Sequence, residues 1–204
     1  MFRKLLVVLL AVPTAITAAC NDGPTGPAPA SAAQLSGSPA ASAASLPRVQ
    51  TALAGGRQDV LVNMLDACDP DSFNAVLGPG SCVRSGGVKF EQFIAQLTRL
   101  GFAAPWRFAP QNSNVRVGQT FVATNKGGEV HTFTEVDEFG GGIVPSLNQL
   151  AHLSTVAPEC TALDPDDFVA PGGVYREEAG QVGTSKFQCC IHPWMRLEAS
   201  VSDR

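Results

Sequence analysis

The ten residues KFQCCIHPWM at 186–195 place two cysteines, a histidine and a methionine on one short segment. Cys189, His192 and Met195 follow the spacing C-x-x-H-x-x-M. This mixture favours a soft, redox-active metal, because zinc rarely takes methionine and calcium or magnesium prefers oxygen ligands. Copper accepts all three side chains when two imidazoles and a thiolate form a plane and methionine binds weakly along the axis. The segment therefore predicts a copper site that needs one more histidine.

His131 is the stronger candidate for that second imidazole. The chain has three histidines, and His131 lies in the alternating segment EVHTFTEV at 129–136, which is typical of a strand. His152 lies in a long connection rich in glycine and proline, where a surface or capping histidine is the alternative reading. Ligands on rigid strands are placed more accurately than ligands on loops, and this favours His131.

The composition favours a turn-rich β protein over a helical bundle. The chain has 204 residues, 45% of them hydrophobic, with 20 glycines, 15 prolines and only 16% charged residues. This length suits one domain with attachments. The net charge is −4, and no stripe of lysine and arginine is present, so nucleic acid is not an expected partner.

The start of the chain has the features of an export signal. Arg3 and Lys4 precede a short apolar run, and residues 1–19 are predicted to be a signal peptide. The run TAAC resembles the lipobox of bacterial lipoproteins, which implies cleavage before Cys20 and attachment of lipid to it. A plain secretory signal that leaves Cys20 as an odd thiol is the alternative. The stretch 20–47 has no large aromatic residue and almost no charge, which predicts a flexible tether.

Residues 48–104 are predicted to form a helical element before the strands. The segment VKFEQFIAQLTRLGF at 88–102 places apolar residues three and four apart, as on one face of a helix. The segment at 60–82 is interpreted as two short helical pieces separated by Asp-Pro. Its acidic residues do not have the spacing of a calcium-binding loop and are expected to cap helices or face solvent: Asp66, Asp69 and Asp71.

Two separated segments together resemble the cupredoxins, the blue copper proteins of the plastocyanin and amicyanin type. These are RFAPQNSNVRVGQTFVATNKGGEVHTF at 107–133 and KFQCCIHPWMRLEASV at 186–201. The resemblance implies a mainly β fold, a Greek-key β-sandwich over 105–204, following the helical element. It also implies one copper ion with four ligands: His131, Cys189, His192 and Met195.

Two positions depart from the family pattern without removing a ligand. Thr132 follows the first histidine where the family often has asparagine, and threonine can still hydrogen-bond between the two metal-bearing segments. Leu197 stands two residues after the methionine, where glycine is common.

The resemblance implies one-electron transfer outside the cytoplasm between redox partner proteins, such as a c-type cytochrome or a membrane oxidase or reductase. No enzymatic activity is expected, because four protein ligands leave no open position for a substrate. A periplasmic copper carrier or storage protein is one alternative, and a binding module without redox function is another. The protein is expected to be exported to the periplasm or cell surface, with the membrane contacted only through the lipid.

The docking surface for such a partner is expected around His192. If that histidine reaches the surface, Pro193 and Trp194 would form an apolar rim around it. Packing of Trp194 onto residues 48–104 is an equal alternative.

The adjacent cysteines should serve different purposes. Successive residues of a strand point to opposite faces, so Cys189 faces the metal and Cys190 points away from it. With Cys20 lipidated and Cys189 bound to the metal, four of the six cysteines remain. Cys68 and Cys82 bracket a short loop with a Gly-Pro-Gly turn and are expected to pair, which leaves Cys160 to pair with Cys190. Two separately buried thiols are the alternative for Cys160 and Cys190.

Overall fold

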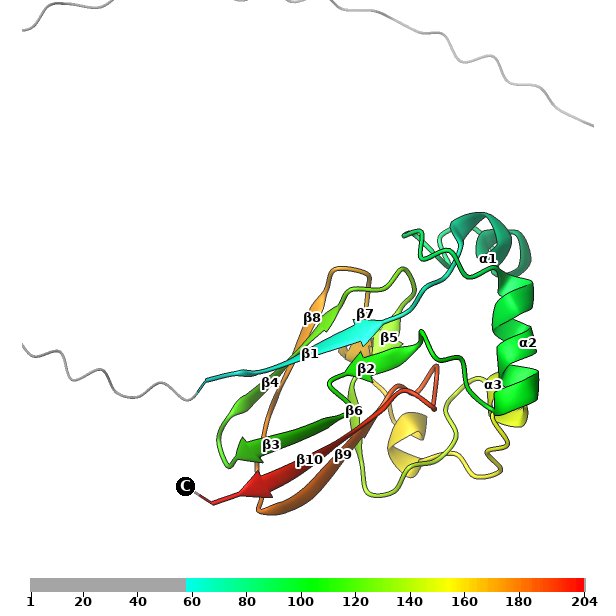
Figure 1. Ribbon diagram of the computed structural model, residues 1–204. Helices are drawn as coiled ribbons and strands as arrows, with labels where there is room; N and C mark the ends of the chain where they lie inside the picture. The colour runs from blue at the N-terminus through cyan, green and yellow to red at the C-terminus, as the bar shows by residue number, and fades with distance from the viewer. Residues whose placement is uncertain (1–57, 204) are drawn as a thin grey trace, which may run out of the picture. The chain divides into compact units, whose positions relative to one another are not determined.

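A computed structural model describes residues 58–203 of the chain (Figure 1). The predicted signal peptide at 1–19, the lipidated Cys20 and the tether at 20–47 lie outside the described residues. Within 58–203, no helix is long and apolar enough to cross a membrane.

Two four-stranded sheets make up most of the structure. The first has the order β2-β1-β4-β8 and consists of β1 (Val60–Leu65), β2 (Arg107–Ala109), β4 (Thr120–Asn125) and β8 (Val174–Glu178). The second has the order β3-β10-β9-β6 and consists of β3 (Asn112–Arg116), β6 (Thr134–Val136), β9 (Gly183–Gln188) and β10 (Arg196–Ser202). The pairs β1–β4 and β3–β10 are parallel, and the other pairs within these sheets are antiparallel. A separate pair joins β5 (His131–Thr132) to β7 (Phe168–Val169).

The two sheets pack face to face through aromatic side chains. Phe121 on β4 lies 4.8 Å from Phe187 on β9, measured between ring centroids, and Phe133 stacks on Phe187 at 4.4 Å. Strand β10 alternates as a half-buried strand should, with Leu197 turned into the core and Glu198 turned outward. The mainly β sandwich is therefore confirmed, together with the helical, disulfide-braced element described next.

The helical element lies between β1 and β2 in the chain. It contains α1 (Pro70–Leu77) and α2 (Phe90–Leu100), and α2 contacts both α1 and the short helix α3 (Pro145–Leu150) (Figure 1). The carboxylate of Asp69 caps α1 by accepting from the amide of Ser72, as the sequence indicated for this acidic group. Gly101 ends α2 in the left-handed conformation, with φ of 74°.

The prediction of a helix at 60–65 is wrong, because these residues form strand β1. Val62 and Met64 are buried while Leu61 is 68% exposed, which is the two-residue alternation of a strand. Apolar residues on both faces of VLVNML obscured that alternation. Since β1 pairs with β2 and β4, the first sheet begins upstream of residue 105.

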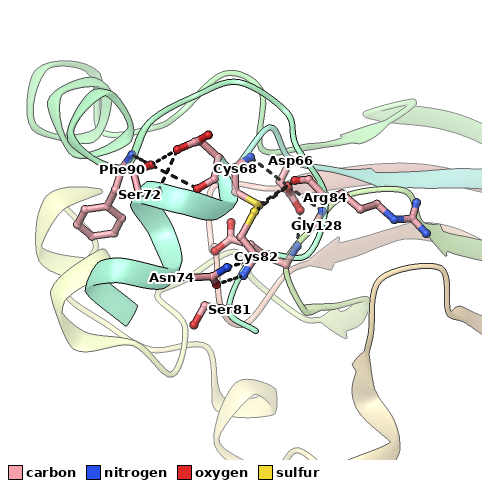
Figure 2. Close-up of a disulfide and its surroundings, with 12 residues drawn as sticks. Asp66, Cys68, Ser72, Asn74, Ser81, Cys82, Arg84, Phe90 and Gly128 are labelled. Carbon is pink, nitrogen blue, oxygen red and sulfur yellow. Dashed lines mark hydrogen bonds between the residues drawn. A yellow bond between two sulfur atoms is a disulfide. The ribbon is translucent and has the colours of Figure 1, made fainter. Parts of the chain in front are cut away.

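Both predicted disulfides are present. Cys68–Cys82 closes the loop that carries α1, and Asn74 fastens Cys82 by accepting from its amide and donating to its carbonyl, each at 2.9 Å (Figure 2). Cys160, in the 3-10 turn Pro158–Thr161, is joined to Cys190, which lies just after β9. A further 3-10 turn spans Pro165–Asp167.

Candidate metal centre

Three potential metal ligands converge at one end of the sandwich. Strand β5 supplies His131, and the segment between β9 and β10 supplies Cys189 and His192. The Nδ1 atoms of both imidazoles lie 3.8 Å from Cys189 Sγ, and the three ligand atoms lie within 4.8 Å of one another. All three side chains are buried, as is Met195 in the same connecting segment. The structure thus brings together the predicted first histidine, the thiol and the second histidine.

The sulfur of Cys189 is held by backbone amides as well. The amides of Thr132 and His192 each donate to Sγ at 3.4 Å. Burial would raise the pKa of this thiol, but hydrogen bonds and charge from His131 and His192 outweigh burial and hold its pKa well below the ordinary value. The site is therefore built to keep Cys189 as a thiolate, the form that binds metals.

Thr132 ties the two metal-bearing segments together, as the sequence predicted for this position. Its side-chain hydroxyl accepts from the amide of Cys190 at 2.8 Å, while its own amide donates to Cys189 Sγ. The adjacent cysteines also divide as predicted. Cys190 is in the disulfide with Cys160, and Cys189 is the free cysteine of the described residues.

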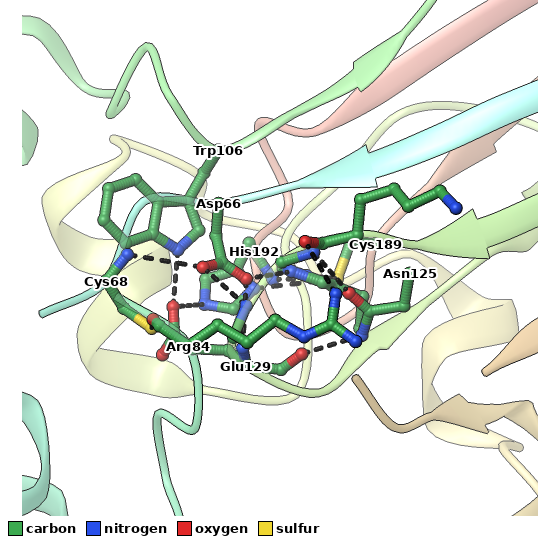
Figure 3. A network of polar contacts seen from close by, with 12 residues as sticks. Asp66, Cys68, Arg84, Trp106, Asn125, Glu129, Cys189 and His192 are labelled. Atoms are coloured by element: carbon green, nitrogen blue, oxygen red, sulfur yellow. Dashed lines mark hydrogen bonds and ion pairs between the residues drawn. The ribbon is translucent and has the colours of Figure 1, made fainter. Parts of the chain in front are cut away.

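Two carboxylates that the sequence did not assign face the far sides of the imidazoles. Asp66, directly after β1, lies with Oδ2 2.9 Å from His131 Nε2, and it accepts from the amides of Gly128 and Glu129 at 2.9 and 3.0 Å (Figure 3). Burial alone would raise the pKa of Asp66, but these hydrogen bonds lower its pKa to about 2. Burial would likewise lower the pKa of His131, yet hydrogen bonds to Asp66 and Cys189 raise its pKa to about 9 in the metal-free site.

Glu129 stands opposite the second imidazole. Its Oε2 accepts from the indole nitrogen of Trp106 at 2.5 Å and lies 3.7 Å from His192 Nε2. Burial raises the pKa of Glu129 against the opposing influence of His192 and Trp106. Asp66 and Glu129 also approach Cys68, but the sulfur of Cys68 belongs to a disulfide and is not available as a thiolate ligand.

His192 does not reach the surface, so the predicted exposed rim is wrong. The side chain of His192 is 3% exposed, and Pro193 is buried. Trp194 packs toward α2, with its ring centroid 6.0 Å from that of Phe93, and this is the alternative that the sequence left open. A mostly apolar cavity of about 400 Å³ lies between α2, α3 and His192. The helical element covers this end of the sandwich, and sequence periodicity gave no sign of where it would pack.

His152 plays no part in the cluster. It is exposed just after α3 and has a positive φ of 57°. Among residues 58–203, the convergent set of imidazole and thiolate donors contains His131 instead.

The donor set fits a soft metal ion such as copper. Two unprotonated Nδ1 atoms and one thiolate can meet around a single ion, while the nearest carboxylates are occupied by hydrogen bonds to the far imidazole nitrogen, the indole and backbone amides. Met195 lies on the same segment, after His192, and is also buried.

The strand arrangement and the order of these donors along the chain decide the type of fold. A first histidine lies on the short strand β5, and the cysteine, second histidine and methionine lie between β9 and β10, the last two strands of the β-sandwich. The fold is cupredoxin-like.

Comparisons with known proteins returned cupredoxins among the solved structures. A purple cupredoxin from Nitrosopumilus maritimus covers 71% of this chain and 100% of its own, at 15% identity and a TM-score of 0.39. Oxidised plastocyanin from Dryopteris crassirhizoma covers 48% of this chain and 89% of its own, at 18% identity and a TM-score of 0.32. The Cu(I) form of a methionine-to-alanine mutant of amicyanin covers 47% of this chain and 73% of its own, at 19% identity and a TM-score of 0.31.

No family model and no curated protein matches the chain. At these identities and TM-scores, the assignment of the fold rests on the strands and donors of this chain.

Proposed function

We propose that this chain is a type 1 copper protein that carries single electrons between redox partners outside the cytoplasm. The observation that carries the proposal is the buried convergence of two imidazole Nδ1 atoms on the sulfur of Cys189. Copper held by these donors would supply the one-electron couple.

The residues around the ligands favour a site whose geometry changes little when a bound copper ion changes its oxidation state. His131 is held by Asp66, and Cys189 is held by two backbone amides. The Cys160–Cys190 disulfide fixes the residue next to the thiolate. Ligands held in this way need little rearrangement between two oxidation states, and this favours rapid electron transfer.

The other elements of the proposal follow from this site. Four protein ligands leave no position for a substrate, so the chain is proposed not to be an enzyme. Redox proteins, such as a c-type cytochrome or a membrane oxidase or reductase, are the proposed partners. Two disulfides within 58–203 support an oxidising compartment, in keeping with export and a lipid anchor at Cys20.

A copper carrier or storage protein on the same scaffold is the alternative function. A carrier must release its metal readily, whereas Cys189 here is fully buried. This burial favours retention of the metal and therefore electron transfer.

Addition of Cu(II) to the purified protein tests the proposal. We expect an intense thiolate-to-copper absorption band, a stoichiometry of one, and reversible reduction. His131→Ala should abolish the band, while the control His152→Asn should keep it, because asparagine tolerates the positive φ at that exposed position. A band that depends on His152 and not on His131 would refute the ligand assignment. Rapid loss of the metal to a competing chelator would favour the carrier function.

A further inference from the structure

Asp66 makes an unusually complete set of hydrogen bonds at the junction of β1 and the helical element. It accepts from the amides of Cys68 at 3.3 Å, Gly128 at 2.9 Å and Glu129 at 3.0 Å, in addition to its contact with His131 Nε2 at 2.9 Å. The Asp66 side chain is 1% exposed. A single carboxylate thus joins the first sheet, the helical element and the loop that leads into β5.

The loop has a backbone shape that permits this contact. A Cβ atom added to Gly127 would overlap the Asp66 carboxylate. Glycine at 127 therefore lets the loop backbone lie directly against the carboxylate. The loop is also fixed by Asn125, whose side-chain oxygen accepts from the amide of Gly127 at 2.9 Å.

The arrangement determines which nitrogen of His131 is available to a metal. Three amides already point at the Asp66 oxygens, so the carboxylate acts as an acceptor and His131 Nε2 must carry the proton. When a metal replaces the proton on Nδ1, this nitrogen faces Cys189 Sγ, 3.8 Å away, while Nε2 keeps its proton. A hydrogen bond at one ring nitrogen selects the metal-binding role of the other.

We propose that Asp66 is a positioning residue that fixes the tautomer of His131 and, by placing a buried negative charge behind this ligand, favours Cu(II) over Cu(I). This proposal rests on the proposed function and goes beyond it, because it predicts a site tuned to a low reduction potential. The partner that reduces it must then be a comparably strong one-electron donor.

The direction of the effect follows from electrostatics. A negative charge stabilises the ion with the higher positive charge, and the interaction is strong where little water screens it. Glu129 makes a useful contrast at the other imidazole, because its oxygen lies 3.7 Å from His192 Nε2, beyond hydrogen-bonding distance. The specific pairing is therefore the one between Asp66 and His131.

Potentiometric titration of copper-loaded variants tests the proposal. Asp66→Asn removes the charge and leaves one accepting oxygen in place of the two that now serve three backbone amides and His131. We expect the Cu(II)/Cu(I) equilibrium to move toward Cu(I) about tenfold, which corresponds to an increase of ~59 mV for one electron. The control Asp71→Asn removes the same charge from an exposed position of α1 and should leave the potential nearly unchanged. A shift for Asp66→Asn no larger than that for Asp71→Asn would overturn the proposal.

A second measurement on the wild-type protein covers the case in which Asp66→Asn fails to fold or to bind copper. In the diamagnetic Cu(I) form, proton–nitrogen NMR should show the Nε2 proton of His131 well downfield of that of His192, which has no acceptor within hydrogen-bonding distance among residues 58–203. Equal shifts, or the reverse order, would contradict the proposal. If the protein takes up no copper, the proposed function fails, and the same comparison on the metal-free protein still tests the Asp66–His131 pairing.

Discussion

Replacement of Phe93 by alanine tests the role of the helical element that covers the candidate metal centre. Phe93 is 3% exposed, and its ring centroid lies 4.6 Å from Trp106, 5.5 Å from Phe73 and 6.0 Å from Trp194. Removing a buried phenyl ring loses its transfer free energy and leaves a cavity, at a cost of about 3–5 kcal/mol. The value should lie within that range because several aromatic neighbours lose a packed partner at once.

Urea denaturation of the metal-free protein, followed by tryptophan fluorescence and circular dichroism, measures this loss. Phe102→Ala is a matched control, because Phe102 lies just beyond the end of α2 and is 45% exposed. We expect the control to lower the free energy of unfolding by less than about 1 kcal/mol. If Phe93→Ala and Phe102→Ala lower the free energy of unfolding by similar amounts, the idea that α2 packs onto the end of the sandwich that carries the candidate metal centre is refuted.

The remaining predictions concern the metal and the residues next to it. Met195→Leu should keep the copper–thiolate band and raise the reduction potential in voltammetry, because a weak axial donor to Cu(II) is lost. The metal-free protein should lose about 2 kcal/mol of its free energy of unfolding as pH falls from about 4 to about 2, because the pKa of Asp66 is lowered from 3.8 to about 2 on folding. Denaturation measured across this pH range should show a smaller loss in Asp66→Asn, and an equal loss in that variant would contradict the prediction. A Cys160→Ser/Cys190→Ser variant should lower the free energy of unfolding by roughly 3 kcal/mol through loss of the disulfide, and an unchanged denaturation midpoint would argue against it.

Local spacing in the sequence was enough to predict the thiolate and the second histidine. Cys189 and His192 lie three residues apart, and chain geometry alone brings their side chains together. His131 could be predicted because it lies among alternating apolar and polar residues, which predict a strand, and a strand holds a ligand more rigidly than a loop. The disulfide partners could be predicted because, with Cys20 and Cys189 set aside, Cys68 and Cys82 bracket a short loop and only Cys160 and Cys190 remain.

The features that the sequence did not reveal depend on tertiary contacts. Asp66 and His131 are separated by 65 positions, and an aspartate in a segment with two other acidic residues carries no local sign of its partner. The burial of His192 depends on where α2 packs, which amphipathic periodicity cannot determine. Strand β1 was mistaken for a helix because six residues are too few to separate the two periodicities when both faces carry apolar side chains.

The separation between the two halves of the metal centre also has a consequence for the order of folding. Cys189 and His192 are close in any compact form of their segment, whereas His131 is 58 positions away from Cys189. The last strand, β10, pairs in parallel with β3, so this part of the sheet requires a long chain closure, and such closures form slowly. An incompletely folded chain therefore offers an ion only the donors of residues 189–195, without His131. The ion should therefore bind tightly only after the sheets have assembled. Retention of the metal would then indicate that the chain has finished folding.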